Sequence, residues 1–377
     1  MSTNRSIWLF SRPIDLLVLG LPVWLTWLAC FLFKDDILQQ SSPLWVWVVF
    51  VIGIDVSHVW STIFRTYLDK EEFNHHKRVL ILAPIISFVI FFAAANVSTN
   101  FFWTVLAYLA VYHFIKQQYG FLRLYQAKYG KVEYTKWFKD TRIIYLSMLY
   151  PVLYWHINST RNFSWFVEND FFNFRSFLVD QKFLGEQGLY WINTIGNNIY
   201  WMLIIAWLVE EVVLTRRSNN RLAWGKMIWV VATAVNWYLG IVYFNSDFAF
   251  TITNVVAHGV PYMALIFFYV ERKKAVKAPE HKIKVGSVLL NVLVMLTVVL
   301  ILAFGEEYLW DMFLYRDNEP FFSGIVPYPF AVLESVHWQA IALALLSLPQ
   351  VTHYILDGYI WKGNHKNPYL KKILFSS

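Results

Sequence analysis

The sequence predicts an all-α protein, a polytopic bundle of about ten transmembrane helices with both termini in the cytoplasm. Of its 377 residues, 58% are hydrophobic and only 15% are charged, whereas soluble globular proteins average roughly a quarter charged residues. Apolar stretches of about twenty residues recur along the chain, and each can cross a bilayer as a helix. Residues 1–377 are therefore expected to form a single integral membrane domain.

Hydropathy defines ten predicted spans in chain order. The first stretch is too long for a signal-peptide core and has no small-residue cleavage site, so we expect it to remain as a helix. The last stretch is too long for one straight helix and contains Pro349, which predicts a kink or a break. The predicted spans are residues 14–33, 44–64, 79–98, 101–122, 142–157, 190–213, 226–244, 248–270, 285–304 and 329–361.

The distribution of basic residues predicts the orientation of these spans. With a cytoplasmic N-terminus, 27 of the 32 Lys and Arg residues fall in the two termini, in the loops after even-numbered spans or in the span ends next to these loops, as Lys116, Arg142 and Lys226 do. The positive-inside rule produces this pattern. The net charge of +7 therefore indicates topology and contact with anionic inner-leaflet lipid, and nucleic acid is not an expected partner. The single cysteine, Cys30, excludes an intrachain disulfide and a thiolate metal cluster.

Ionisable side chains within the spans are the main functional signal. A charged group at the bilayer centre is unfavourable by at least about 2.5 kcal/mol, so such residues usually face the bundle interior and serve a function. Asp55 precedes His58 by three residues, so the two share a helical face. His353 and Asp357, four residues apart, form a second such pair. Bundle-core metal sites combine these side chains with partners from facing helices. The predicted metal ligands are His58, His113, His258, His353, Asp55 and Asp357.

The depths of these residues decide which of them can meet. At a rise of about 1.5 Å per residue, all but His258 fall in one layer of the cytoplasmic half, and modest tilt brings His258 within reach. His337 would lie about 24 Å from His353 on a straight helix. Glu334 and His337 are therefore second-tier candidates on the substrate path. The remaining second-tier candidates, His75 and His76, occupy the predicted loop after span 2 and could fold over the site.

Imidazole and carboxylate groups without thiolates suit iron, zinc or manganese. We predict non-haem iron that uses O2, because altering an unactivated apolar lipid usually needs oxidative chemistry. The protein would then be a membrane-bound oxidoreductase of the oxygenase, hydroxylase or desaturase type, acting on a lipid or another apolar small molecule. Asp55 and Asp357 would bind the metal or fix the imidazole tautomers, and Asn254 is a further catalytic candidate. A cytoplasmic electron donor could dock on the basic face.

Three alternatives use the same buried residues. A haem-binding membrane protein would hold the haem between histidines of facing helices at matching depth. A metal-independent acyl- or glycosyltransferase would use one histidine with Asn254 or an aspartate as the base. A transporter or proton channel would use the aspartates and histidines as a relay. The carboxylate–histidine pairs could also serve only as structural hydrogen bonds, but their number within membrane spans favours a metal site.

Overall fold

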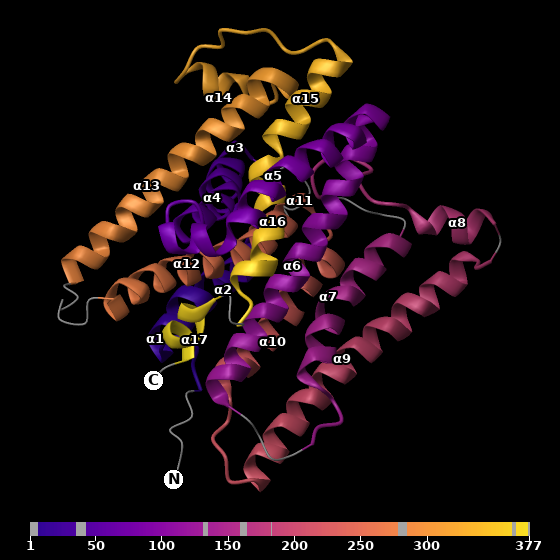
Figure 1. Cartoon of the computed structure of the whole chain (residues 1–377). Helices are drawn as coiled ribbons and strands as arrows, with labels where there is room; N and C mark the ends of the chain where they lie inside the picture. Colours follow the sequence, from indigo (N-terminus) through magenta and orange to yellow (C-terminus); the bar gives the residue numbers. More distant parts are fainter. Residues whose placement is uncertain are drawn as a thin grey trace. The chain divides into compact units, whose positions relative to one another are not determined.

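Helices form all the regular secondary structure in the part of the chain that the structure describes, which confirms the predicted all-α class. The structure is a computed structural model, shown in Figure 1. It describes residues 7–34, 43–130, 135–158, 164–181, 183–277, 285–363 and 367–375.

Eight helices among the described residues are long and apolar enough to cross a membrane. Helices also occupy the two other predicted spans, as α6 (Thr99–Tyr129) and α7 (Asp140–Ile157). The exact number of spans therefore remains a prediction. The terminal residues 1–6 and 376–377 lie outside the described part, so the cytoplasmic location of both termini also remains a prediction.

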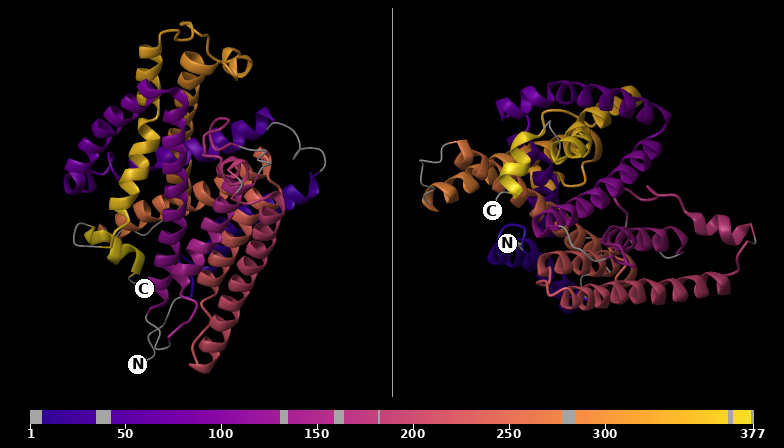
Figure 2. Two further views of the ribbon diagram at one scale, coloured as in Figure 1. Left: turned by 90° about the vertical axis from the view of Figure 1, so that its right-hand side faces the viewer. Right: turned by 60° about the horizontal axis from the view of Figure 1, so that its bottom comes forward.

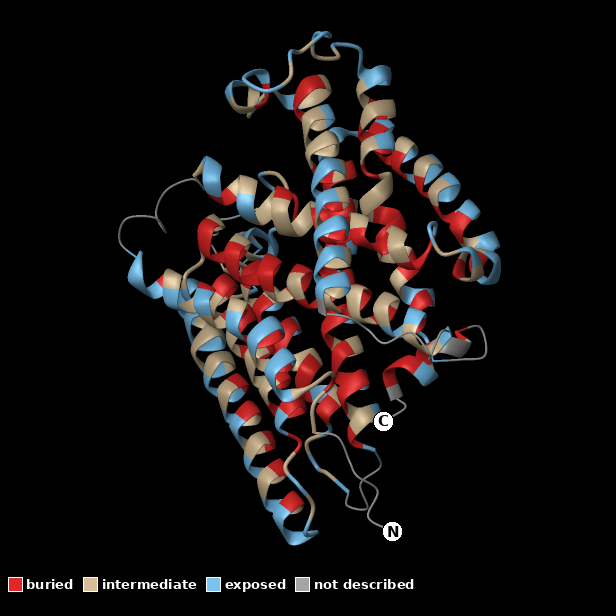
Figure 3. Ribbon diagram, turned by 90° about the vertical axis from the view of Figure 1, so that its left-hand side faces the viewer, coloured by how far each residue is buried: buried red, intermediate tan, exposed pale blue. Residues whose placement is uncertain are grey.

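Exposed apolar side chains cover much of the surface of the candidate spans. In α13 (Val285–Trp310), for example, Leu293 and Ile301 are exposed. Figure 3 shows exposed and buried residues on different faces of the long helices. This distribution is expected for helices that pack on one side and face lipid on the other, because lipid tails are as apolar as the side chains.

The last predicted span, residues 329–361, begins too early. The helix starts only at the first residue of α15 (Val336–Leu346), and the backbone N–H of Leu333 instead donates to the carbonyl of Phe313 at 2.9 Å. The predicted break is confirmed, because α16 (Leu348–Ile360) is a separate helix with Pro349 in its first turn. Proline favours this position because the missing N–H would have no intrahelical partner there.

Contacts divide the chain into two compact units, and the first contains residues 1–46 and 111–261. Its helices α7, α9 (Glu186–Arg217) and α10 (Trp224–Trp237) pack together (Figure 2). The ring of Tyr200 on α9 stacks on Tyr150 of α7 at 4.9 Å, and its hydroxyl donates to a carbonyl of α10 at 2.9 Å. The other elements are residues 111–129 of α6, residues 256–261 of α12 (Val256–Lys277), α1 (Arg12–Ile14), η1 (Asp15–Gly20), α2 (Leu21–Leu32), α3 (Leu44–Val46), α8 (Phe174–Asp180), η4 (Tyr238–Tyr243), α11 (Asp247–Phe250) and η5 (Thr251–Val255).

A buried ion network connects α7, α9 and α10. Asp140 accepts hydrogen bonds from Lys136 at 2.7 Å, from Lys226 at 3.1 Å and from the indole N–H of Trp207 at 2.9 Å. Lys226 also donates to Glu211 at 2.6 Å, and Lys136 donates to the other oxygen of Glu211. Burial tends to raise the pKa of Asp140, but the two ammonium groups outweigh burial and hold this pKa well below its usual value. The two cations and two anions thus neutralise one another away from water.

The second unit contains residues 47–110 and 262–376. Its helix α5 (Lys70–Val97) packs against α15 and α16, and α4 (Ser57–Ser61) packs against α13. Asp69 caps α5, because its carboxylate accepts hydrogen bonds from the N–H groups of Glu71 and Glu72 at 3.0 and 3.2 Å. The other elements are residues 99–110 of α6, residues 262–277 of α12, η2 (Trp47–Val56), η3 (Thr62–Arg65), η6 (Asp311–Tyr315), α14 (Glu319–Ser323) and α17 (Pro368–Phe375).

A fully buried arginine fixes the end of α16 in this unit. The guanidinium of Arg65 lies 3.8 Å from the ring centre of Tyr269 and 3.9 Å from that of Trp361. It also donates to the backbone carbonyl of Ile360, the last residue of α16. These cation–π contacts and the hydrogen bond hold α16 against the segment that contains His58.

Candidate metal centre

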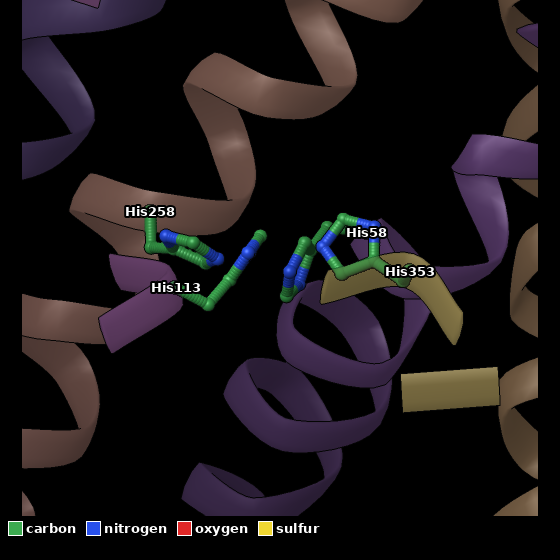
Figure 4. Close-up of side chains that lie close together, drawn as sticks. All are labelled: His58, His113, His258 and His353. Carbon is green, nitrogen blue, oxygen red and sulfur yellow. The ribbon is translucent and has the colours of Figure 1, made fainter. Parts of the chain in front are cut away.

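Four buried histidines lie close together in the structure (Figure 4). Each of His58, His113, His258 and His353 offers a nitrogen atom, and these four atoms all lie within 4.8 Å of one another. None of the four residues is more than 3% exposed. Nitrogen atoms on opposite sides of an ion, each at about 2.0–2.1 Å, would be about 4.2 Å apart. The observed spacing is close to this limit, so the group could hold a metal ion.

Wide helical turns precede two of these histidines. The π-helix η2 ends two residues before His58, and the π-helix η5 ends three residues before His258. A π-helical turn inserts an extra residue and changes the direction of the following side chains, and such turns are frequent at functional sites. The turns therefore help to set the direction in which these two imidazoles point.

His58 and His353 form one pair within the group. Their ring centres are 5.0 Å apart, and the ring of Tyr262 lies 4.9 Å from that of His353. His58 is in the first turn of α4, whereas His353 lies in the middle of α16. The packing of α4 against α16 thus brings together residues that are almost three hundred positions apart in the sequence.

With Asp357 ionised, a chain of hydrogen bonds sets the tautomer of His353. The hydroxyl of Tyr262 donates to Asp357 at 2.6 Å and lies 3.0 Å from the hydroxyl of Thr62, which lies 2.7 Å from Nδ1 of His353. Since the phenol has a single proton and gives it to the carboxylate, Thr62 must donate to the phenol oxygen. Nδ1 of His353 must then donate to Thr62. The protonated Nδ1 leaves the lone pair on Nε2, which is the form of imidazole that binds a metal.

The two predicted carboxylates lie next to the histidines but outside the group of four. Asp55 is 3.6 Å from Nδ1 of His58, and Asp357 is 3.9 Å from Nδ1 of His353. Both distances are too long for a direct hydrogen bond. Asp357 reaches His353 only through Tyr262 and Thr62, and neither aspartate is among the four grouped residues.

His113 and His258 form the other pair. Their ring centres are 4.9 Å apart, and Phe114 stacks on the ring of His258 at 3.7 Å. Pro261 has no N–H, so the carbonyl four residues earlier, that of Ala257, loses its helical partner. Gln118 donates to this carbonyl at 3.2 Å. The glutamine therefore stabilises α12 where it presents His258.

A polar residue follows each of the four histidines at the fourth position, on the same helical face. Three of these residues were not predicted as site residues, although this spacing is visible in the chain. Gln117 donates to the backbone carbonyl of His258 at 2.7 Å, while the others form the hydrogen-bond chain at His353. The four residues, in chain order, are Thr62, Gln117, Tyr262 and Asp357.

The other candidates do not belong to the four-histidine group. Asn254 is buried, and its amide bonds to the hydroxyl of Thr253 at 3.2 Å. The segment with His75 and His76, predicted as a loop, forms the first turns of α5, because Asp69 caps a helix there. His75 is exposed, whereas His76 is buried and bonds to Asn367 at 2.9 Å.

The second-tier candidates Glu334 and His337, which are three residues apart, do not share a helical face. Glu334 precedes α15 and so has no helical neighbour three residues later, and both side chains are exposed. Neither Glu334 nor His337 belongs to the four-residue group that could hold the metal ion.

No protein-family model matches the chain, and no curated protein or solved structure matches it either.

Removing the hydroxyl of Tyr262 tests the hydrogen-bond chain. We expect Tyr262→Phe to weaken metal binding by about 10- to 100-fold, the usual effect of losing a group that orients a metal ligand. Chelator competition measures this affinity. Tyr269→Phe is the matched control, because Tyr269 is also buried but donates to Glu72. Equal affinities in the two variants would contradict the assigned tautomer.

Proposed function

We propose that the protein is an integral-membrane enzyme that uses non-haem iron and O2 to oxidise a lipid or another apolar molecule. The observation that carries this proposal is the group of four buried histidines on helices α4, α6, α12 and α16. Neutral imidazole suits iron, zinc, copper and nickel. Iron is proposed because oxidation of an unactivated hydrocarbon needs a redox-active metal, which zinc is not.

Four donors match a closed structural zinc site as well as a reactive iron centre, so the identity of the metal decides between the two. A structural zinc site is closed by four ligands in a tetrahedron. Iron commonly takes six ligands, so four imidazoles would leave two positions for O2 and substrate. The protein's own residues would hold the four imidazoles in place, and the buried surroundings would exclude water from the reaction.

The spacing of the histidines disfavours the haem alternative. A porphyrin supplies four nitrogen atoms around its iron and leaves only two positions for protein ligands. Four imidazole nitrogens within 4.8 Å of one another would compete with the porphyrin for the same space. The transferase and transporter alternatives need no metal, so a metal analysis distinguishes them from the proposed enzyme.

The basic loops support a cytoplasmic setting for this activity. We propose that the centre lies in the cytoplasmic half of the membrane, with both termini in the cytoplasm and anionic lipid against the basic loops. An acidic electron donor could bind the same basic face if the reaction consumes electrons.

Elemental analysis with spectroscopy tests the proposal. Protein purified without chelators is expected to contain roughly one iron per chain, with no Soret band. Nitric oxide added to the reduced protein should give the paramagnetic resonance signal of a ferrous nitrosyl centre. Zinc as the sole metal, or a protein without metal that still transports or transfers a substrate, would contradict the iron enzyme.

A further inference from the structure

A cavity of about 250 Å³ lies beside His353 within the second unit. Its walls come from α4 and η3 on one side and from α15 and α16 on the other. Apolar cavities of about 150 Å³ are large enough to bind benzene. This cavity therefore has room for a larger hydrocarbon segment. Its apolar lining includes Val59, Trp60, Ile63, Leu348, Pro349 and Leu356.

One buried hydroxyl group in the wall is not satisfied by the protein. Thr352 lines the cavity and is 7% exposed, yet its Oγ1 has no hydrogen-bond partner among the described residues. Helical threonines often bond to the carbonyl four residues earlier, as Thr233 of α10 does at 2.8 Å. Thr352 does not, although an unpaired buried hydroxyl is unfavourable by about 1–3 kcal/mol. Its hydroxyl is thus available to a ligand.

A water molecule is a poor occupant of this cavity. A buried water needs two to four polar partners. Besides Thr352, the polar lining residues are Thr62, Tyr67 and His353. The hydroxyl of Thr62 already bonds to Tyr262 and His353, and that of Tyr67 donates to the carbonyl of Leu80 at 2.8 Å. The walls around them are apolar, so a mainly hydrocarbon ligand with a single polar group fits better.

We propose that this cavity binds the hydrocarbon chain of the substrate, a lipid with a hydroxyl or carbonyl oxygen that accepts a hydrogen bond from Thr352. His353 is the next residue in the chain and also lines the cavity, so the oxygen-bearing end of the ligand would lie nearest the metal centre. That the ligand is a substrate rests on the proposed function, whereas its binding can be measured separately.

Photo-crosslinking tests the binding directly. The full-length protein in lipid nanodiscs is irradiated with a long-chain fatty alcohol that carries a diazirine, and the labelled residues are identified by mass spectrometry. We expect labels on the cavity walls, at positions such as Leu348 and Leu356, and competition by unmodified fatty alcohol. Labels confined to exposed faces such as that of α13 would overturn the proposal.

Two variants sharpen the test. Leu348→Trp should fill the cavity and abolish its labelling, whereas Leu293→Trp, on an exposed face of α13, should leave the labelling unchanged. Thr352→Val keeps the shape but loses the hydroxyl. It should weaken alcohol binding by about fivefold and leave the binding of an alkane probe unchanged. Equal loss of both probes in Thr352→Val would contradict the assigned hydrogen bond.

Metal content measured on the same samples separates the two proposals. Cavity labelling of a protein without metal would support the lipid site and contradict the iron enzyme. A protein with iron whose cavity is not labelled would contradict the lipid site and leave the iron enzyme standing.

Discussion

Replacing any one of the four grouped histidines by alanine is expected to remove the metal ion from the purified protein. Each imidazole supplies a donor, so its loss should weaken binding by more than the about 10- to 100-fold effect of an outer-shell change. Elemental analysis after gel filtration measures the occupancy. His76→Ala is the matched control, because His76 is equally buried but bonds to Asn367; this variant should retain the metal.

The same series tests whether the two histidine pairs bind one ion together. If they do, His113→Ala and His353→Ala will each lose the entire metal content. If each pair bound its own ion, either variant would lose only half, and the single four-histidine centre would be contradicted.

The second large effect is expected from the buried ion network. Asp140→Asn removes the charge that faces Lys136 and Lys226 while keeping the size of the side chain. Leaving a buried charge without its partner typically lowers the free energy of unfolding by about 3–5 kcal/mol. Denaturation in detergent, followed by circular dichroism, measures this change. Glu186→Gln is the control, since its exposed pair with Arg175 should contribute less than about 1 kcal/mol.

The pH dependence of stability gives an independent check on Asp140. Its pKa in the folded protein lies below the ordinary value, so the unfolded chain takes up the proton first as the pH falls. The stabilisation is therefore complete above about pH 4 and is lost as the pH falls below that value. Asp140→Asn should reduce this acid sensitivity. An unchanged pH profile would show that the network does not stabilise the fold.

The sequence was sufficient to nominate the four histidines that the structure groups together. They could be found because placing an ionisable side chain in an apolar span is energetically unfavourable, so such a residue usually has a function. The helical rise also relates the sequence position of each histidine to its depth in the membrane. The break before α16 was also predictable, since Pro349 cannot continue a helix in the ordinary way.

The supporting residues could not be predicted in the same way. Thr62 and Tyr262 are only mildly polar, so their presence in a span gives no strong signal, and Thr62 bonds to a histidine 291 residues away. The π-helical turns before His58 and His258 have no simple sequence pattern. The two compact units are each built from separate segments, an arrangement that depends on long-range packing rather than on local composition.

X-ray absorption spectroscopy of the metal-loaded protein tests the central claim most directly. Four histidine ligands predict an inner shell of nitrogen or oxygen atoms, at about 2.0–2.1 Å in the zinc-substituted protein, with the multiple scattering of four imidazoles. A spectrum with sulfur at about 2.3 Å, or with only one or two imidazoles, would contradict a metal centre held by His58, His113, His258 and His353.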